Sequence, residues 1–89
     1  MRKLLSTSQF KKDLKKSKKR GKDIRKIQGI IEKLIANKAL ASSHKPHRLT
    51  GNWSHCWECH IEPDWLLIWD EDKDSVTLIR TGTHSDLFE

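Results

Sequence analysis

Several features that mark common classes of protein are missing from this sequence of 89 residues. It has no tyrosine, no glycine-rich phosphate-binding loop, and no serine or cysteine within a recognisable nucleophile signature. No apolar run approaches the roughly 18 residues that span a bilayer, which argues against an integral membrane protein. Polar residues directly follow Met1–Leu5, so this segment lacks the apolar stretch of a signal peptide. We therefore expect a cytoplasmic protein whose two cysteines stay reduced.

The length predicts one domain spanning residues 1–89, and the charge is divided unevenly along it. Residues 1–48 carry 16 Lys and Arg against three acidic residues, a balance of +13. Residues 49–89 carry two Lys and Arg against nine acidic residues, a balance of −7. This asymmetry predicts a polyanionic partner for the first half, and it favours nucleic acid over a membrane surface. The alternative is that the basic helices are simply solvated.

The basic half has the periodicity of two amphipathic helices. The first is expected to start at Ser8 as its N-cap and to end at Gly21, with a narrow buried stripe of Phe10, Leu14 and Ser17. The second is expected to be capped by Asp23 and to end at Asn37, with an apolar stripe of Ile24, Ile27, Ile31, Leu34 and Ile35. Two helices joined at a glycine favour an antiparallel hairpin that packs on a sheet.

Beyond about residue 38 the period changes to that of strands. Three segments have the composition of strands, namely Trp57–Ile61, Trp65–Trp69 and Val76–Thr81. A short first strand is expected at Leu4 and Leu5, and a helical turn capped by Thr83 is expected over residues 84–88. The order predicts an α+β fold, in which an N-terminal helical hairpin packs on a mainly antiparallel sheet of four to five strands, followed by a short C-terminal helical turn.

The segment Cys56–His60 matches the pattern for c-type haem attachment and contains a Cys-x-x-Cys pair. Strand residues three apart point to opposite faces, so the two thiols would not converge on a metal or a disulfide. A second pair of zinc ligands is also missing. We interpret both cysteines as ordinary strand residues and expect no metal or cofactor.

Three histidines fall at the boundaries of the expected elements, where Asp64 and Arg80 also lie: His47, His60 and His84. Each alone would be a structural or surface residue, but together they favour a convergent polar pocket. Histidine titrates near neutrality and can serve either proton transfer of RNA cleavage, in which a 2′-hydroxyl loses a proton and the leaving 5′-oxygen gains one. With the basic hairpin nearby and Phe88 available for base stacking, the pattern favours a metal-independent ribonuclease.

Three ordered segments carry a family resemblance: His47–Trp53 (HRLTGNW), His60–Ile68 (HIEPDWLLI) and Arg80–Phe88 (RTGTHSDLF). Together with the lysine-rich first helices, they make the chain resemble the YafQ branch of the RelE/ParE toxin superfamily over nearly its whole length. The resemblance implies a RelE-like fold and a ribosome-dependent endoribonuclease, an mRNA interferase that cleaves mRNA in the ribosomal A site. It also implies a cognate antitoxin, in a heterotetramer built around an antitoxin dimer that binds operator DNA.

The resemblance also implies roles for individual residues. The catalytic pattern of the family falls on His47, His60, Asp64 and His84, while Arg80 would hold the scissile phosphate and Phe88 is the aromatic residue near the C-terminus. Two positions depart from the family, because Trp69 stands where tyrosine is common and Cys59 stands where small residues are usual. We expect the basic helical surface to bind RNA phosphates through Lys11, Lys12, Lys15, Lys16, Lys18, Lys19, Arg20, Lys22, Arg25 and Lys26.

Two other classes of function remain open from the sequence. One is a noncatalytic toxin of the ParE type, which shares the fold and inhibits DNA gyrase. The other is a plain RNA-binding module or DNA-binding repressor. Neither gives a reason to gather His47, His60 and His84 in one place.

Overall fold

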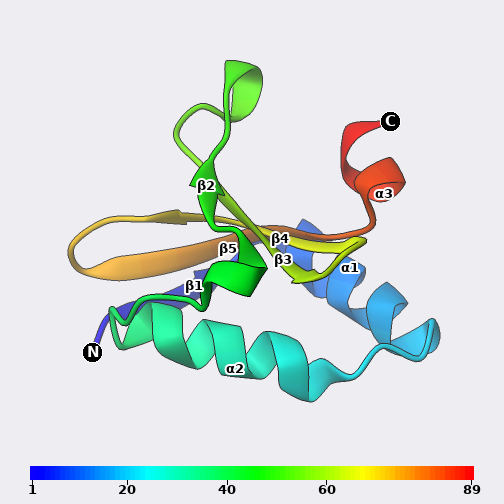
Figure 1. Cartoon of the computed structure of the whole chain (residues 1–89), viewed down its shortest axis with the longest axis horizontal. Helices are drawn as coiled ribbons and strands as arrows, with labels where there is room; N and C mark the ends of the chain where they lie inside the picture. Colours follow the sequence, from blue (N-terminus) through cyan, green and yellow to red (C-terminus); the bar gives the residue numbers. More distant parts are fainter.

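The computed structural model describes residues 1–89 and contains a mixed sheet flanked by helices (Figure 1). The helices are α1 (Ser8–Lys19), α2 (Ile24–Ile35) and α3 (His84–Phe88). The strands are β1 (Lys3–Ser6), β2 (His47–Arg48), β3 (Trp57–Glu62), β4 (Trp65–Glu71) and β5 (Ser75–Gly82). Two short 3-10 turns flank β2, namely η1 (Ser42–His44) and η2 (Gly51–Trp53).

The strands lie in the order β1-β5-β4-β3-β2, and only the β1–β5 pair is parallel. Strands β3, β4 and β5 follow one another through tight turns, so they pair as antiparallel neighbours. This confirms the predicted α+β fold with a mainly antiparallel sheet and a C-terminal helical turn. The two-residue strand β2 was not predicted, and β4 continues to Glu71, two residues beyond the apolar segment Trp65–Trp69 that the sequence indicated.

The helix ends follow the capping rules, with one correction. The N-cap of α1 is Thr7 rather than Ser8, because the Thr7 hydroxyl accepts from the Phe10 N–H at 2.9 Å and donates to the Ile79 carbonyl at 2.7 Å. The second bond also fastens the start of α1 to β5. Asp23 caps α2 as predicted, and Asn37 adopts the left-handed conformation just beyond its end, with φ of 56°.

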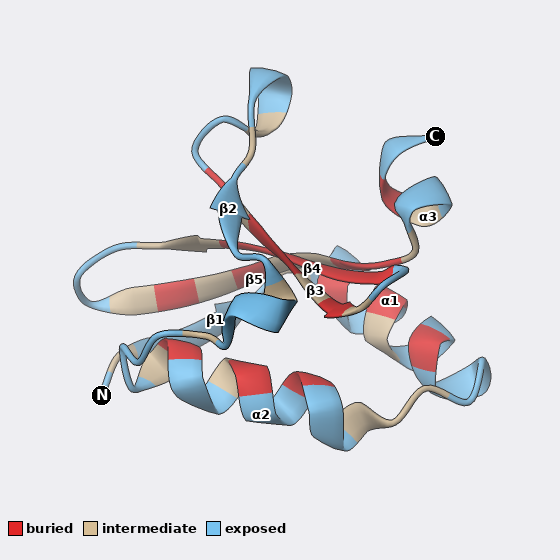
Figure 2. Ribbon diagram, in the orientation of Figure 1, coloured by how far each residue is buried: buried red, intermediate tan, exposed pale blue.

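The main core lies between the helical hairpin and one face of the sheet. Figure 2 shows that the buried residues of α1 and α2 lie on their sheet-facing sides. This core contains Phe10, Ile27, Ile30, Leu34, Cys59, Ile61, Trp65, Leu67, Trp69, Val76 and Leu78. The alternating residues of β3 therefore bury one face of that strand in this core, as the sequence predicts. The continuous apolar run of β4 is buried on both faces.

A smaller core lies on the opposite face of the sheet and consists of Cys56, Leu66, Ile68 and Leu87. Leu49, Trp53 and Ile79 pack around it, so this face is covered by α3 and by the segment around η2. In Figure 1, α3 and the β2–η2 segment rise from the side of the sheet opposite α2. The same face also carries polar side chains of β2 and β3.

Cys56 and Cys59 belong to different cores, as their spacing predicts, and both thiols are free. Burial raises the pKa of the Cys59 thiol to about 12, and the neighbouring Glu58 carboxylate adds to the effect. The thiol is therefore neutral at physiological pH. No helix in the structure has the length and apolar character that crossing a membrane requires.

Leu67 in the middle of β4 has no exposed surface, so its truncation tests the main core. We expect Leu67→Ala to lower the free energy of unfolding by about 2–5 kcal/mol, because it leaves a cavity between the sheet and the hairpin. Leu4→Ala is the matched control, since Leu4 is 45% exposed on β1 and should cost far less. Urea unfolding of both variants measures the difference. Equal losses would contradict this account of the core.

Candidate active site

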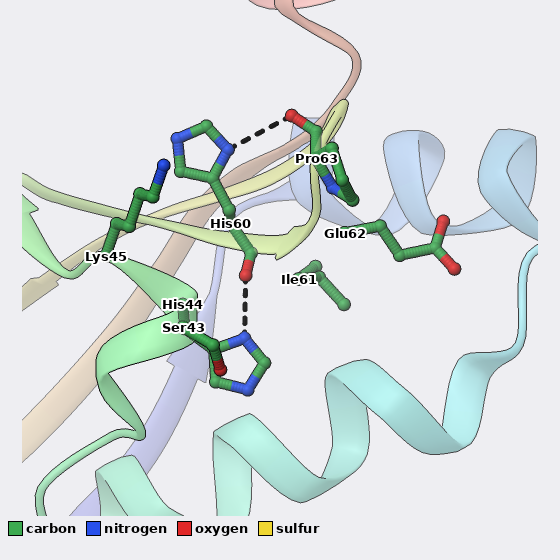
Figure 3. A pocket seen from close by; sticks show the side chains of 7 residues that line it. All are labelled: Ser43, His44, Lys45, His60, Ile61, Glu62 and Pro63. Carbon is green, nitrogen blue, oxygen red and sulfur yellow. Dashed lines mark hydrogen bonds between the residues drawn. The ribbon is translucent and has the colours of Figure 1, made fainter.

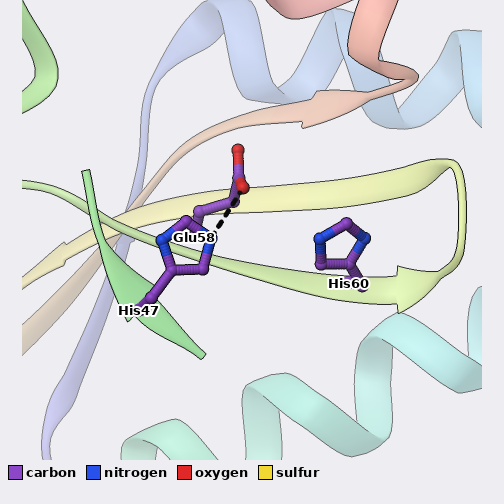
Figure 4. A group of neighbouring side chains, drawn as sticks. All are labelled: His47, Glu58 and His60. Atoms are coloured by element: carbon purple, nitrogen blue, oxygen red, sulfur yellow. Dashed lines mark hydrogen bonds and ion pairs between the residues drawn. The ribbon is translucent and has the colours of Figure 1, made fainter. Parts of the chain in front are cut away.

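Strands β2 and β3 place three polar side chains on the face of the sheet that the hairpin does not cover. Glu58 and His60 alternate with core residues along β3, and His47 on β2 pairs with Glu58. The His47 Nε2 atom lies 3.0 Å from Glu58 Oε1, and the candidate ligand atoms of His47, Glu58 and His60 all lie within 4.8 Å of one another (Figure 4). The structure thus brings together two of the histidines singled out in the sequence.

Glu58 is a site residue that the sequence reasoning missed. Its side chain is only 8% exposed, and Oε2 is buried without a hydrogen-bond partner. A buried carboxylate oxygen without a partner is costly, so it points to an acceptor that is completed by a proton, an ion or a substrate hydroxyl. The available signal was its position two residues before His60, which puts both side chains on one face of a strand.

The two histidines differ in the hydrogen bonds that their rings make. The Pro63 carbonyl can only accept, so His60 Nδ1 donates to it at 3.1 Å and Nε2 keeps a lone pair in the neutral ring. Both ring nitrogens of His47 face acceptors, namely the Arg48 carbonyl at 3.2 Å and Glu58 at 3.0 Å. His60 Nε2 is therefore free to accept a proton, whereas both ring nitrogens of His47 are engaged within the protein.

His84 and Phe88 reach the same face from α3. The backbone N–H of His84 donates to Asp64 Oδ1 at 3.0 Å, which fixes the start of α3 to the turn between β3 and β4. The His84 ring makes no hydrogen bond of its own and lies 5.1 Å from the Phe88 ring, which in turn contacts Trp53 edge-on. Asp64, predicted as a catalytic residue, thus has the geometry of a residue that positions His84.

Asp86 holds α3 against the C-terminal end of α1. Its carboxylate accepts from Arg20 at 2.6 and 3.2 Å, from Lys16 at 3.4 Å and from the Thr83 N–H at 2.9 Å. The Arg20 bonds above all hold the pKa of Asp86 well below its usual range. A Cβ atom at Gly82 would come within 2.9 Å of Asp86 Oδ2, so glycine is required at this end of β5.

Arg80 lies at the end of β5 as predicted, but its guanidinium is already bound. Its Nε and Nη2 atoms donate to Asp13 of α1 at 2.8 and 3.1 Å, and the same carboxylate accepts from Thr81 N–H at 3.2 Å and Gln9 at 3.1 Å. Nη1 makes no hydrogen bond within the protein, so it is the donor that remains for a phosphate. Asp13 lies on the buried side of the basic helix and was also missed from the sequence.

The ten basic residues predicted to bind RNA divide into two groups. Five of them form ion pairs with the protein's own carboxylates: Lys16 and Arg20 with Asp86, Lys22 and Lys26 with Glu62, and Arg25 with Asp23. The other five are exposed and make no ion pair: Lys11, Lys12, Lys15, Lys18 and Lys19. The positive charge that remains available is thus concentrated on α1.

His47, Glu58 and His60 form the one group of at least three such side chains that could also hold a metal ion. Two imidazoles and one carboxylate are ligands that suit first-row transition metals. No metal ligand was predicted from the sequence, because these residues come from two strands that the local pattern does not connect.

A family model described as the bacterial toxin of a type II toxin–antitoxin system, YafQ, matches residues 2–89. The mRNA interferase toxin YafQ of Escherichia coli K12 is 39% identical over 83 residues, which cover 92% of this chain and 90% of that protein. The crystal structure of YafQ from E. coli BL21(DE3) aligns over 100% of both chains with a TM-score of 0.95 and 36% identity. A metal-bound toxin from Helicobacter pylori aligns over 99% of this chain and 100% of its own, with a TM-score of 0.93 and 34% identity.

These similarities, added to the fold and to the histidine site, define a bacterial toxin of a type II toxin–antitoxin system. The chain belongs to the YafQ family. The same fold occurs in the crystal structure of the E. coli DinJ–YafQ complex, where the TM-score is 0.93, the identity is 37% and both chains are covered fully.

The Asp13–Arg80 pair gives stability that depends on pH. Burial alone would raise the pKa of Asp13, but the hydrogen bonds from Arg80, Gln9 and Thr81 outweigh it and leave the pKa below its ordinary value of 3.8. A lowered carboxyl pKa stabilises the fold above the ordinary value, and this contribution is lost as the pH falls through the folded-state pKa.

We therefore expect Asp13→Asn to lower the free energy of unfolding by about 2–3 kcal/mol at pH 7, because it leaves Arg80 without its charged partner. The difference from the wild type should shrink as the pH falls below 3.8. Asp74→Asn is the matched control, since the Asp74 side chain is exposed and unpaired. Urea unfolding at several pH values measures the effect, and a difference that stays constant with pH would be inconsistent with this pair.

Proposed function

We propose that the protein is an endoribonuclease, the mRNA interferase toxin of a type II toxin–antitoxin pair, which cleaves mRNA in the ribosomal A site and thereby inhibits translation. The observation that carries the proposal is the convergence of His47, Glu58 and His60 on the face of the sheet that the hairpin does not cover, with His84 tied by its backbone to Asp64 in the turn that follows β3. Its relatives named mRNA interferase toxin YafQ support the same activity.

The chemistry needs two proton transfers, and the hydrogen bonds of the site suggest how they are divided. His60 Nε2 takes the proton of the ribose 2′-hydroxyl, and the resulting oxygen attacks the adjacent phosphorus. The bond from phosphorus to the 5′-oxygen then breaks, and His84 protonates that oxygen. The products are a 2′,3′-cyclic phosphate and a 5′-hydroxyl end, so that every atom and proton is accounted for.

The remaining residues stabilise and orient the substrate. The free Nη1 of Arg80 is a charged donor available to the phosphate as negative charge develops on its oxygens, and His47 lies in the same cluster as His60. Glu58 orients the His47 ring through the 3.0 Å contact with Nε2, and Asp64 positions His84 through its backbone. Phe88 is 36% exposed next to His84, where it can stack on a base.

The same proposal assigns the partners. The five unpaired lysines of α1 bind ribosomal RNA phosphates. The five basic residues that form ion pairs within the protein contribute less to this binding. A cognate antitoxin, as in the E. coli DinJ–YafQ complex, masks this basic surface or the histidine site with an acidic segment, in a heterotetramer around an antitoxin dimer that binds operator DNA. Action on translating ribosomes places the protein in the cytoplasm, without a membrane partner. A gyrase inhibitor or a plain binding module leaves the buried Glu58 beside two histidines unexplained.

His84→Ala tests the assignment of the general acid. General acid–base help contributes about 10²–10⁴ in rate, so single-turnover cleavage on programmed ribosomes should slow by about that factor. Binding to ribosomes should be retained, because one exposed imidazole adds little to a large interface. Ser85→Ala, at the adjacent exposed position, is the control. A folded His84→Ala protein that cuts at the wild-type rate would exclude this role.

The salt dependence of ribosome binding tests the two groups of basic residues. We expect Lys12→Gln to reduce the log–log salt slope by about 0.7–0.9, the value for one lost phosphate contact. Lys26→Gln should reduce it less, because Glu62 already neutralises Lys26 at 2.8 Å. Binding measured between low and moderate salt gives both slopes. If Lys26 mattered more than Lys12, the assignment of the free lysines would be incorrect.

A further inference from the structure

A pocket lies beside His60, between η1 and the end of β3, and the chemistry assigned above does not use it. Its volume is about 420 Å³, which is in the range that holds a small ligand or one nucleotide unit. Figure 3 shows the side chains around it: Ser43, His44, Lys45, His60, Ile61, Glu62 and Pro63. Only Ile61 and Pro63 among them are aliphatic, and the other five are polar or charged, so the pocket suits a polar, charged group.

The backbone of η1 is built so that it presents Lys45 to this pocket. His44 Nδ1 donates to the His60 carbonyl at 2.7 Å and fastens η1 to β3. Lys45 then adopts the left-handed conformation, with φ of 46°, which is uncommon for a residue other than glycine. Because the backbone turns at Lys45, the His44 ring contacts the β3 backbone, while the Lys45 ammonium points toward the His60 imidazole (Figure 3).

Lys45 differs from Arg80 and Arg48 because it neither pairs with a carboxylate nor stacks on an aromatic ring. Arg80 is bound to Asp13 at 2.8 Å, and the Arg48 guanidinium lies over the Trp57 ring at 5.5 Å. The carboxylate of the pocket, Glu62, is neutralised by two lysines of the hairpin at 2.8 Å each. The pocket therefore combines one free ammonium with a carboxylate that is already paired, which favours an anion.

We propose that Lys45 and this pocket form a subsite for an RNA phosphate, the 5′-phosphate of the nucleotide whose 2′-hydroxyl attacks the scissile phosphorus. This inference rests on the proposed endoribonuclease function. His60 acts on the ribose of that nucleotide, and the Lys45 ammonium beside His60 binds the phosphate on the 5′ side of the same ribose. Lysine binds phosphate as a flexible point charge, so Lys45 holds the substrate while the fixed Arg80 and His47 face the scissile group.

The first measurement is single-turnover cleavage on programmed ribosomes at a series of toxin concentrations. Lys45→Met should raise the concentration for half-maximal rate about tenfold, the effect of one lost charged hydrogen bond, and leave the saturating rate within about threefold. Lys45→Arg should recover most of the loss, since it keeps the charge. The matched control is Lys73→Met, at an exposed position in the turn between β4 and β5, which should behave as the wild type.

The second measurement changes the RNA and needs no folded variant. An mRNA in which a neutral methylphosphonate replaces that 5′-phosphate should impair the wild type by the same factor as Lys45→Met. It should cost the Lys45→Met protein nothing further, because the charge and its partner act as a pair. Additive losses, or a coupling to a different phosphate, overturn the subsite.

The two levels of the proposal fail in different ways. If the wild type cleaves and Lys45→Met matches Lys73→Met, the subsite is wrong and the endoribonuclease function stands. If the wild type leaves the mRNA on programmed ribosomes intact, the proposed function is wrong and the subsite is lost with it.

Discussion

Burial of β4 on both faces is the constraint on which the rest of the structure depends. Trp65, Leu67 and Trp69 pack against the helical hairpin, whereas Leu66 and Ile68 face the other way and need a cover of their own. α3 and the segment around η2 provide that cover. The candidate site lies on this same face, where His47 of β2 covers the buried Glu58 and His60 is partly exposed.

The ion pairs between the two halves fix the site on this framework. The basic hairpin and the acidic half meet through Asp13–Arg80, Arg20–Asp86 and the two lysines on Glu62. Each pair ends at an element that carries a site residue, namely β5, α3 and the end of β3. The uneven charge of the sequence thus has two consequences. Ion pairs hold the basic hairpin against the acidic half, and the unpaired lysines of α1 remain available to bind a polyanion.

Local patterns predicted most of the fold, including the period of β3, the apolar run of β4, the caps Asp23 and Thr83, and the C-terminal turn. Thr7 was missed as a cap because adjacent Ser8 has the same local chemistry, and the choice depends on the distant Ile79 carbonyl. The histidines were found from their positions at element ends. The carboxylates that contact His47 and Arg80 were not predicted, because Glu58 meets His47 across 11 residues and Asp13 meets Arg80 across 67, and no local period connects them.

The central claim is that the site activates a ribose 2′-hydroxyl. The most direct measurement uses programmed ribosomes carrying an mRNA with a single 2′-deoxynucleotide at the cleaved position, compared with the all-ribose mRNA. The account predicts that the deoxy substitution stops cleavage at that bond, and that the all-ribose mRNA gives a 2′,3′-cyclic phosphate and a 5′-hydroxyl end. Cleavage of the deoxy-substituted mRNA at the same bond and rate would contradict it.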